Sequence, residues 1–337
     1  PQNDETIRSA LMKVAHSAAT ADAIEIVAID AAAKVTPLQR SSTPVTLRDP
    51  GLAHMTFARW RLTSYSALTK DLITPYQPPG AGDSDSVPEA TQTDHPAANR
   101  FSFPRGAKVG VMLHNLFEEM DFTSGEEEIR GSLSRHLQRF GFETSLQTSL
   151  QEWTTDILNT PFSSDGELAL SSIAADSKVA ELEFHFPITR EIDAYGLNAL
   201  LERYDYIDDA SLLSFQAVEG MMTGLIDLVF EYEGRFYLAD YKSNHLGNSQ
   251  QDYAPDKLLG AIQSHRYHLQ YLIYSVALHR YLQQRVSGYD YDVHFGGAYY
   301  LFLRGMAGRE HPGEGVYFDR PVKPLLQQLD VLFGKQA

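Results

Sequence analysis

The stretch that decides the fold runs Gly224-Leu-Ile-Asp227-Leu-Val-Phe-Glu-Tyr-Glu-Gly-Arg-Phe-Tyr-Leu-Ala-Asp240-Tyr-Lys242. Two runs of β-branched and aromatic residues flank Glu233-Gly234, a turn dipeptide, so the stretch predicts a β-hairpin. With a two-residue loop, Asp227 stands opposite Asp240, and their Cβ atoms lie about 4.5–5.5 Å apart. Lys242 comes two residues after Asp240 and therefore points to the same face of the strand.

Two opposed carboxylates require an explanation. Like charges directly opposite each other destabilise a strand pair, and each raises the pKa of the other. A divalent cation removes this repulsion, because carboxylate oxygens are the ligands that Mg²⁺ prefers. The alternative is an ordinary solvated hairpin edge with surface aspartates. Leu225, Val229 and Leu238 argue against that alternative, since they make the same region largely apolar.

Composition limits the class of protein. The chain has 337 residues, of which 43% are hydrophobic, enough for one large or two modest domains. It begins with Pro, so a fragment or a processed product is expected, and it contains no secretory signal pattern and no apolar run that could span a bilayer. The absence of Cys excludes disulfides, thiolate zinc sites, Fe–S clusters and cysteine nucleophiles. It also fits a reducing compartment such as the cytoplasm.

The formal net charge of −16 bears on the partner. A free-standing nucleic-acid-binding protein usually has a basic surface. Either the partner is not a polyanion, or the positive charge is local, or a bound metal and companion subunits supply it.

The chain is expected to have three parts. Residues 1–70 predict a small α+β segment, with a helix over 5–20 and strands at Ile24–Ile29 and Met55–Leu62. Residues 71–99 are rich in Pro and acidic residues and predict a linker. The main domain then covers 100–337. The chain has no GxxxxGK[S/T] loop, so no ATP site of that type is expected.

The main domain is expected to be α/β, with a central mixed sheet flanked by helices. The first of its predicted helices begins near Gly110, and the others cover 126–140, 148–159, 194–203, 255–285 and 321–333. Its predicted strands are 179–186, the two strands of the hairpin and 295–303. On the long helix over 255–285, a polar and aromatic stripe includes Tyr267, Gln270 and Tyr274.

Asp227, Asp240 and Lys242 have the spacing of a metal-dependent phosphodiesterase site. The carboxylates would hold Mg²⁺ at a phosphate oxygen, and the Lys ammonium would orient water or neutralise the transition state. The backbone carbonyl of Tyr241 offers a further hard oxygen ligand. Glu181 would add an acid from another strand.

Two features remain ambiguous from the residues alone. Strand alternation places Glu181, Glu183 and His185 on one face, so either glutamate could serve the site, and an exposed strand-edge role is equally compatible. His114 lies on an otherwise apolar helix turn, where a lone histidine is more often a packed core residue than a ligand.

Five stretches carry a family resemblance. The chain resembles the C-terminal nuclease region of exonuclease V beta subunits, the RecB chains of RecBCD helicase–nucleases, over about residues 100–320. The matching stretches are Gly110-Val-Met-Leu-His114-Asn-Leu-Phe-Glu118, Gly224-Leu-Ile-Asp227-Leu-Val-Phe, Leu238-Ala-Asp240-Tyr-Lys242-Ser-Asn, His265-Arg-Tyr-His-Leu-Gln270-Tyr-Leu-Ile-Tyr274 with Ala277-Leu-His-Arg-Tyr-Leu, and His294-Phe-Gly-Gly-Ala-Tyr-Tyr-Leu-Phe-Leu-Arg-Gly305.

The resemblance implies a PD-(D/E)xK nuclease-like fold and assigns roles to residues. The implied metal ligands are His114, Asp227, Asp240 and the Tyr241 carbonyl. The implied catalytic residues are Lys242, Asp240, Asp227 and the upstream acid Glu181. The implied supporting residues are the Q-x-x-x-Y pair Gln270 and Tyr274. Tyr267 and Arg266 of the same stretch are expected to contact DNA or to support the site. The usual Pro before the first Asp is replaced by Ile226, as in this subfamily generally. Relatives with an Fe–S cluster are excluded because the chain lacks Cys.

The function implied by the resemblance is a Mg²⁺-dependent DNA exonuclease and endonuclease, with one or two ions, in a complex that repairs double-strand breaks and degrades linear DNA. Its expected partners are single strands from an unwound duplex, the helicase portion of the same polypeptide, to which 1–70 would belong, and the other subunits of a RecBCD-like complex. No membrane partner is expected. Two alternatives are a non-catalytic interaction module with the same fold and a phosphoesterase for small molecules.

Overall fold

The computed structural model describes residues 4–15, 60–69, 99–162, 167–207 and 212–334. The chain divides into two compact units, residues 1–55 and 56–337. In the first, α1 (Asp4–Ala15) confirms the start of the helix predicted over 5–20. The predicted strand Ile24–Ile29 and almost all of the linker 71–99 lie outside the described residues.

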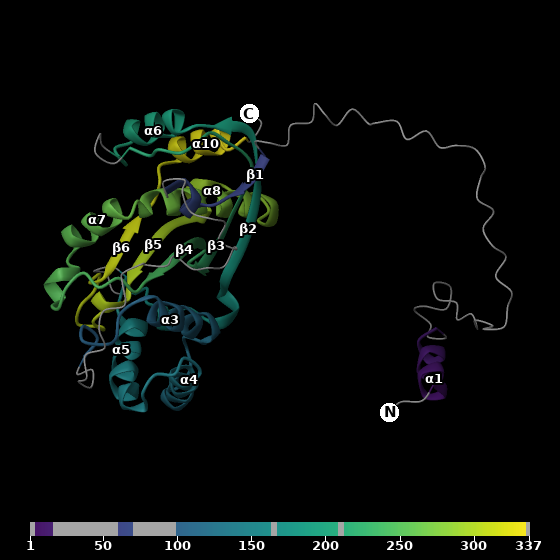
Figure 1. Cartoon of the computed structure of the whole chain (residues 1–337), viewed down its shortest axis with the longest axis vertical. Coiled ribbons are helices and arrows are strands. Elements are labelled where there is room, and N and C mark those ends of the chain that lie inside the picture. The colour runs from purple at the N-terminus through teal and green to yellow at the C-terminus, as the bar shows by residue number, and fades with distance from the viewer. Residues whose placement is uncertain (1–3, 16–59, 70–98, 163–166, 208–211, 335–337) are drawn as a thin grey trace. The chain divides into compact units, whose positions relative to one another are not determined.

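A six-stranded mixed sheet forms the centre of the second unit (Figure 1). The strand order is β1-β3-β4-β5-β6, and β2 pairs with β3. The pairs β1–β3 and β4–β5 are parallel, and the others are antiparallel. The strands are β1 (Trp60–Thr63), β2 (Lys178–Ile192), β3 (Val218–Tyr232), β4 (Arg235–Lys242), β5 (Phe295–Phe302) and β6 (Val316–Asp319). The predicted mixed α/β architecture is confirmed, although β6 was not anticipated.

The hairpin of β3 and β4 has the predicted register. Tyr232 pairs with Arg235, and the ladder continues in step to Leu228 opposite Ala239. The two loop residues, Glu233 and Gly234, both have positive φ, 50° and 75°. Tight two-residue hairpins require this conformation, because its twist matches that of the strands.

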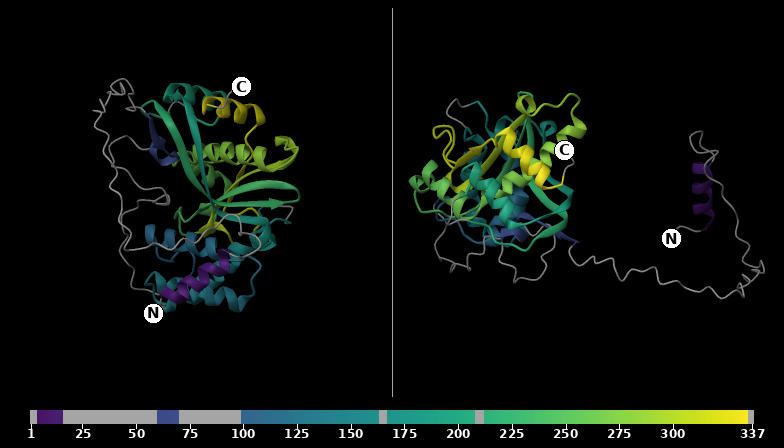
Figure 2. Two further views of the ribbon diagram at one scale, coloured as in Figure 1. Left: turned by 90° about the vertical axis from the view of Figure 1, so that its right-hand side faces the viewer. Right: turned by 90° about the horizontal axis from the view of Figure 1, so that it is seen from above.

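Helices cover both faces of the sheet (Figures 1 and 2). One layer consists of α3 (Ala107–Glu119), α4 (Glu126–Arg139) and α5 (Gln147–Asn159), and the other of α6 (Ala194–Arg203), α7 (Pro255–Ser264), α8 (Tyr267–Arg285) and α10 (Lys323–Leu332); the short helices are α2 (Tyr65–Thr69) and α9 (Tyr291–His294). Each layer encloses its own hydrophobic core. Successive residues of β4 contribute alternately, with Leu238 in the α8 core and Ala239 in the α3 core.

The single long helix predicted over 255–285 is wrong. It is two helices, because Arg266 adopts a left-handed conformation with φ 57° and separates α7 from α8. The sequence has no Gly or Pro at the break that would signal it. Residues 267–279 of α8 are all buried, because neighbours surround this helix on every side.

Residues 60–69 belong to the same unit as the sheet. They lie in the segment that the sequence assigns to the N-terminal part, yet β1 pairs in parallel with β3, from Trp60 opposite Glu219 to Thr63 opposite Met222. The division at 70 and 99 stays a prediction. None of the described helices is long and apolar enough to cross a membrane.

Candidate active site

The candidate site lies where β3 and β4 separate. Backbone pairing between them ends at Leu228 and Ala239. Beyond this point, the backbone N–H of Tyr241 donates to the Asp227 carboxylate, with 2.8 Å between N and Oδ2. A side chain thus replaces the next ladder hydrogen bond, and the strand pair opens at the two aspartates.

Glu181 stands on the other side of Asp227. Its neighbours Ala180 and Leu182 pair with Leu228 and Ile226, which places Glu181 directly opposite Asp227 on β2. The φ angle of Glu181 is 48°, an uncommon conformation for a residue with a side chain. Three acidic residues therefore follow one another across β2, β3 and β4. Burial and the charges of Glu118 and Asp227 raise the pKa of Glu181.

Glu183 has a different environment. Its carboxylate lies 3.1 Å from Nε2 of His185, two residues along the same strand. Strand alternation alone did not separate the two glutamates. The register with β3 does, because only Glu181 stands opposite Asp227.

His114 reaches the site from α3. Its Nδ1 lies 3.4 Å from Oδ2 of Asp227, and its ring meets that of Tyr241 edge-on at 6.0 Å. Burial alone would lower the pKa of His114, but the charge of Asp227 and a hydrogen bond to it raise this pKa to about 9. The imidazole is thus a cation at neutral pH. The Tyr241 ring points to the α3 layer and stacks on Phe117 at 5.1 Å.

Asp240 and Lys242 form a buried ion pair. Nζ of Lys242 lies 2.9 Å from Oδ2 of Asp240, and the two residues are 3% and 2% exposed. Burial raises the pKa of Asp240 to about 7; Lys242 opposes this shift and Asp227 adds to it. A buried pair of this kind contributes little net stability, because both ions lose their hydration. Its retention is more characteristic of a reactive site than of a structural core.

An amide and several tyrosines hold Lys242. Oε1 of Gln270 accepts hydrogen bonds from Nζ of Lys242 at 3.2 Å and from the Tyr300 hydroxyl at 2.8 Å. Nε2 of Gln270 donates to the Tyr274 hydroxyl at 3.1 Å. The ring of Tyr267 lies 4.0 Å from Nζ, at cation–π distance. Gln270, Tyr274 and Tyr267 thus meet around the lysine, and Tyr300 is an unanticipated member.

Arg266 lies apart from this group. Its guanidinium is within 3.5 Å of the Thr69 carbonyl and 3.4 Å of the Leu212 carbonyl. These contacts direct the side chain toward α2 and the segment before β3.

Arg304 is a further residue that the sequence did not single out. It is 1% exposed, and its guanidinium donates to backbone carbonyls on both sides of the site. The acceptors are Ser243 O at 3.3 Å, Phe103 O at 3.2 Å, Pro104 O at 2.6 Å and Arg100 O. It therefore ties the segment before α3, which carries His114, to the end of β4, which carries Lys242.

The donors assembled here suit a hard divalent cation. They are the carboxylates of Asp227 and Asp240, the carbonyl of Tyr241 and the imidazole of His114, and Mg²⁺ prefers oxygen ligands. Among the described residues, no three side chains of His, Asp or Glu are grouped as a ready metal site. In this structure His114 pairs with Asp227 and Lys242 pairs with Asp240.

Comparison with known proteins identifies relatives. No protein-family profile matches the chain. It is 41% identical over 283 residues to "RecBCD enzyme subunit RecB" of Escherichia coli K12, which covers 82% of this chain and 23% of that subunit. The subunit of the same name from Haemophilus influenzae is 40% identical over 70% of this chain and 19% of its own length. That from Mycolicibacterium smegmatis is 29% identical over 82% of this chain and 29% of its own length. The chain thus spans about a quarter of these relatives.

Proposed function

Because the chain is homologous over 82% of its length to RecBCD enzyme subunit RecB, we propose that it is the metal-dependent DNA nuclease part of a helicase–nuclease that repairs double-strand breaks and degrades linear DNA. It would hydrolyse phosphodiester bonds of single strands from an unwound duplex. One observation carries this proposal. Asp227, Asp240 and Lys242 meet where two strands separate, with Glu181 opposite Asp227 and His114 in contact with it.

One or two Mg²⁺ ions are the proposed cofactor. Asp227, Asp240, the Tyr241 carbonyl and His114 would hold the metal, which supplies charge stabilisation at the phosphate and a water of lowered pKa. The raised pKa values of Asp240 and His114 mean that both groups hold their protons more tightly while no metal is bound. Binding would then release protons, because ligands must be deprotonated.

Lys242 has the leading catalytic role among the side chains. Its ammonium is fixed by Gln270 and the Tyr267 ring, so it is preorganised to orient the attacking water or to neutralise charge on the phosphate. The hydroxyls of Tyr300 and Tyr274 hold the amide of Gln270 in the orientation that presents oxygen to the lysine.

Local positive charge offers the DNA strand an approach despite the net charge of −16. Arg105 and His245 both contact the Asn248 side-chain oxygen, at 3.0 and 3.1 Å, on the loop that follows Lys242. Burial lowers the pKa of His245, and the nearby charges of Arg105 and Arg304 act in the same direction. The exposed Arg105 guanidinium thus brings positive charge to this loop, and the lowered pKa keeps the His245 ring beside it neutral.

Replacing Arg105 with Ala is expected to weaken single-stranded DNA binding uniformly across sequences and to reduce the slope of log affinity against log salt by about 0.7. Titrations at several salt concentrations in EDTA would measure this. Arg309→Ala is the control, because Arg309 is also exposed and lies beyond β5. An unchanged slope in Arg105→Ala would remove this loop from the DNA path.

Delivery by partners would complete the function. The acidic chain is expected to bind DNA weakly alone, so that cleavage depends on the helicase portion of its polypeptide and on the other subunits of a RecBCD-like complex. We place this complex in the bacterial cytoplasm, since its relatives are bacterial subunits.

A digest of linear single-stranded DNA tests the proposal. The chain should cleave it with Mg²⁺ and not with EDTA, and it should leave a small nucleotide ester intact. No cleavage by the chain under any metal, with or without its partner subunits, would favour the alternative of a non-catalytic interaction module. Cleavage of the ester alone would identify a small-molecule phosphoesterase.

Glu181→Gln is expected to lower cleavage about 10- to 100-fold, whereas Glu183→Gln should leave it unchanged. The reason is position, because Glu181 stands opposite Asp227 while Glu183 pairs with His185. The two variants remove the same charge from the same strand, so each controls for the other. Equal initial rates for both variants would show that the upstream acid lies elsewhere.

A further inference from the structure

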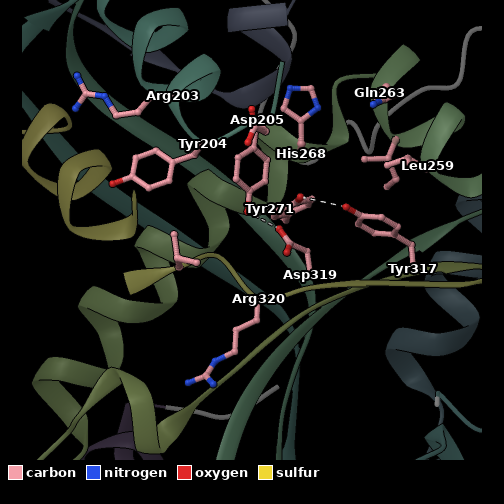
Figure 3. A pocket seen from close by; sticks show the side chains of 13 residues that line it. Arg203, Tyr204, Asp205, Leu259, Gln263, His268, Tyr271, Tyr317, Asp319 and Arg320 are labelled. Atoms are coloured by element: carbon pink, nitrogen blue, oxygen red, sulfur yellow. Dashed lines mark hydrogen bonds between the residues drawn. The ribbon is translucent and has the colours of Figure 1, made fainter. Parts of the chain in front are cut away.

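A second hollow lies on the opposite flank of α8. It has a volume of about 360 Å³ and is bordered by the end of α6, by α7, by the first two turns of α8 and by β6 (Figure 3). Gln270 and Tyr274 of α8 face Lys242, whereas His268 and Tyr271 of the same helix line this cavity. The cavity is therefore separate from the carboxylate site.

Tyrosines make up much of its wall. The rings of Tyr206 and Tyr271 lie 6.3 Å apart at 64°, and those of Tyr271 and Tyr317 lie 6.3 Å apart at 38°. Their hydroxyls are held in place, that of Tyr206 by Asp319 at 2.6 Å and those of Tyr271 and Tyr317 by each other at 3.4 Å (Figure 3). Preorganised aromatic faces of this kind are suited to a flat aromatic ligand.

His268 provides the polar group that points to a ligand. It is 2% exposed, and neither of its ring nitrogens makes a hydrogen bond of normal geometry with a described residue. Burial lowers the pKa of His268 to about 4, with Arg266 acting in the same direction and the Ile262 carbonyl against it. The ring is thus neutral and offers one donor and one acceptor. A backbone hydrogen bond to Ile262 serves at most one ring nitrogen, and the other buried nitrogen is unfavourable unless a ligand binds it.

The charges of the lining select the class of ligand. Arg203 and Arg320 are balanced by Asp205 and Asp319, so an isolated anion gains little. A neutral heterocycle with both donors and acceptors fits this lining better.

We propose that this cavity binds a single unpaired nucleobase, with the ring against the tyrosines that line the cavity and its edge toward His268. A free mononucleotide and a base of a DNA strand share this chemistry, and the choice of DNA rests on the proposed function. A contact path joins the two sites, because Tyr271 meets the Tyr300 ring at 5.7 Å and Tyr300 donates to Gln270.

The test uses two variants of the full chain in EDTA, so that no cleavage occurs. Gln263→Trp fills the cavity from its exposed rim, and Gln138→Trp places the same side chain at an exposed position of α4 as a control. His268→Phe keeps the buried ring and removes both nitrogens. The probes are thymidine 5′-monophosphate, a short oligothymidylate and an abasic oligonucleotide of equal length.

Gln263→Trp and His268→Phe are each expected to weaken binding about 10- to 100-fold, as loss of a stacked base does, while Gln138→Trp binds as the wild type does. A loss confined to the mononucleotide supports the cavity with free nucleotides as its source. A loss on oligothymidylate, with the abasic strand bound weakly throughout, supports it with DNA as the source. If neither probe binds the wild type, or if Gln263→Trp and Gln138→Trp bind equally, the proposal is overturned.

These outcomes are independent of the nuclease assignment. If Gln263→Trp weakens nucleotide binding in a chain that does not cleave DNA with Mg²⁺, the proposed nuclease activity is overturned and the proposed binding cavity stands. If the chain cleaves DNA and Gln263→Trp leaves binding unchanged, the binding cavity is overturned and the nuclease activity stands.

Discussion

Lys242→Met is expected to lower the rate of single-stranded DNA cleavage by about 10²–10³-fold, the loss typical of removing one preorganised donor from a transition state. Met keeps an unbranched side chain of similar length beside the rings of Tyr267 and Tyr300, which in the wild type contact Nζ of Lys242. The variant therefore loses the ammonium and little of the packing. Single-turnover rates at saturating Mg²⁺ would measure the effect.

The change also affects Asp240, which loses its buried partner. Without Lys242 the pKa of Asp240 should rise further, because burial already raises it and Lys242 is the group that opposes this. The activity left in the variant should therefore shift to higher pH. A simple loss of folding would produce no such shift in the pH–rate profile.

Lys257→Met is the matched control. Lys257 lies on α7 with 62% of its side chain exposed, so its removal should change neither rate nor stability. If Lys242→Met were folded and cleaved DNA as fast as Lys257→Met, the assignment of catalysis to this site would be wrong.

The hairpin was predictable because its determinants are local. The turn dipeptide, the alternation of β3 and β4 and the count of residues between Asp227 and Asp240 all lie within 224–242. Side-chain direction follows from the strand period of two, so the opposite orientations of Tyr241 and Lys242 could also be predicted.

The other parts of the site depend on pairings between distant segments. Glu181 and Glu183 are equivalent by alternation, and only the pairing of β2 with β3 distinguishes them. The break at Arg266 has no local signal, since tertiary packing around α8 outweighs the helical pattern of the sequence. Tyr300 reaches Gln270 across 30 residues, a contact that periodicity does not encode.

Arg304→Met is expected to lower the free energy of unfolding by about 3–5 kcal/mol, the range for removing one partner from a buried charged network. The guanidinium donates hydrogen bonds to the carbonyls of Arg100, Phe103, Pro104 and Ser243. The thioether of Met has no donor that could replace these bonds. Thermal unfolding should shift down by about 6–20 °C. Calorimetry on the purified variant would measure it, and exposed Arg309→Met should show no shift.

Arg304→Lys separates the charge from the geometry of this network. An ammonium keeps the positive charge but lacks the planar fork that serves several carbonyls at once. Intermediate stability would mean that the number of hydrogen bonds governs the loss, and wild-type stability would show that charge alone suffices. Because Arg304 joins the segment before α3 to Ser243, next to Lys242, loosening it should separate His114 from the lysine before the whole unit unfolds. In Arg304→Lys, cleavage should therefore fail at a lower temperature than the one at which calorimetry records unfolding.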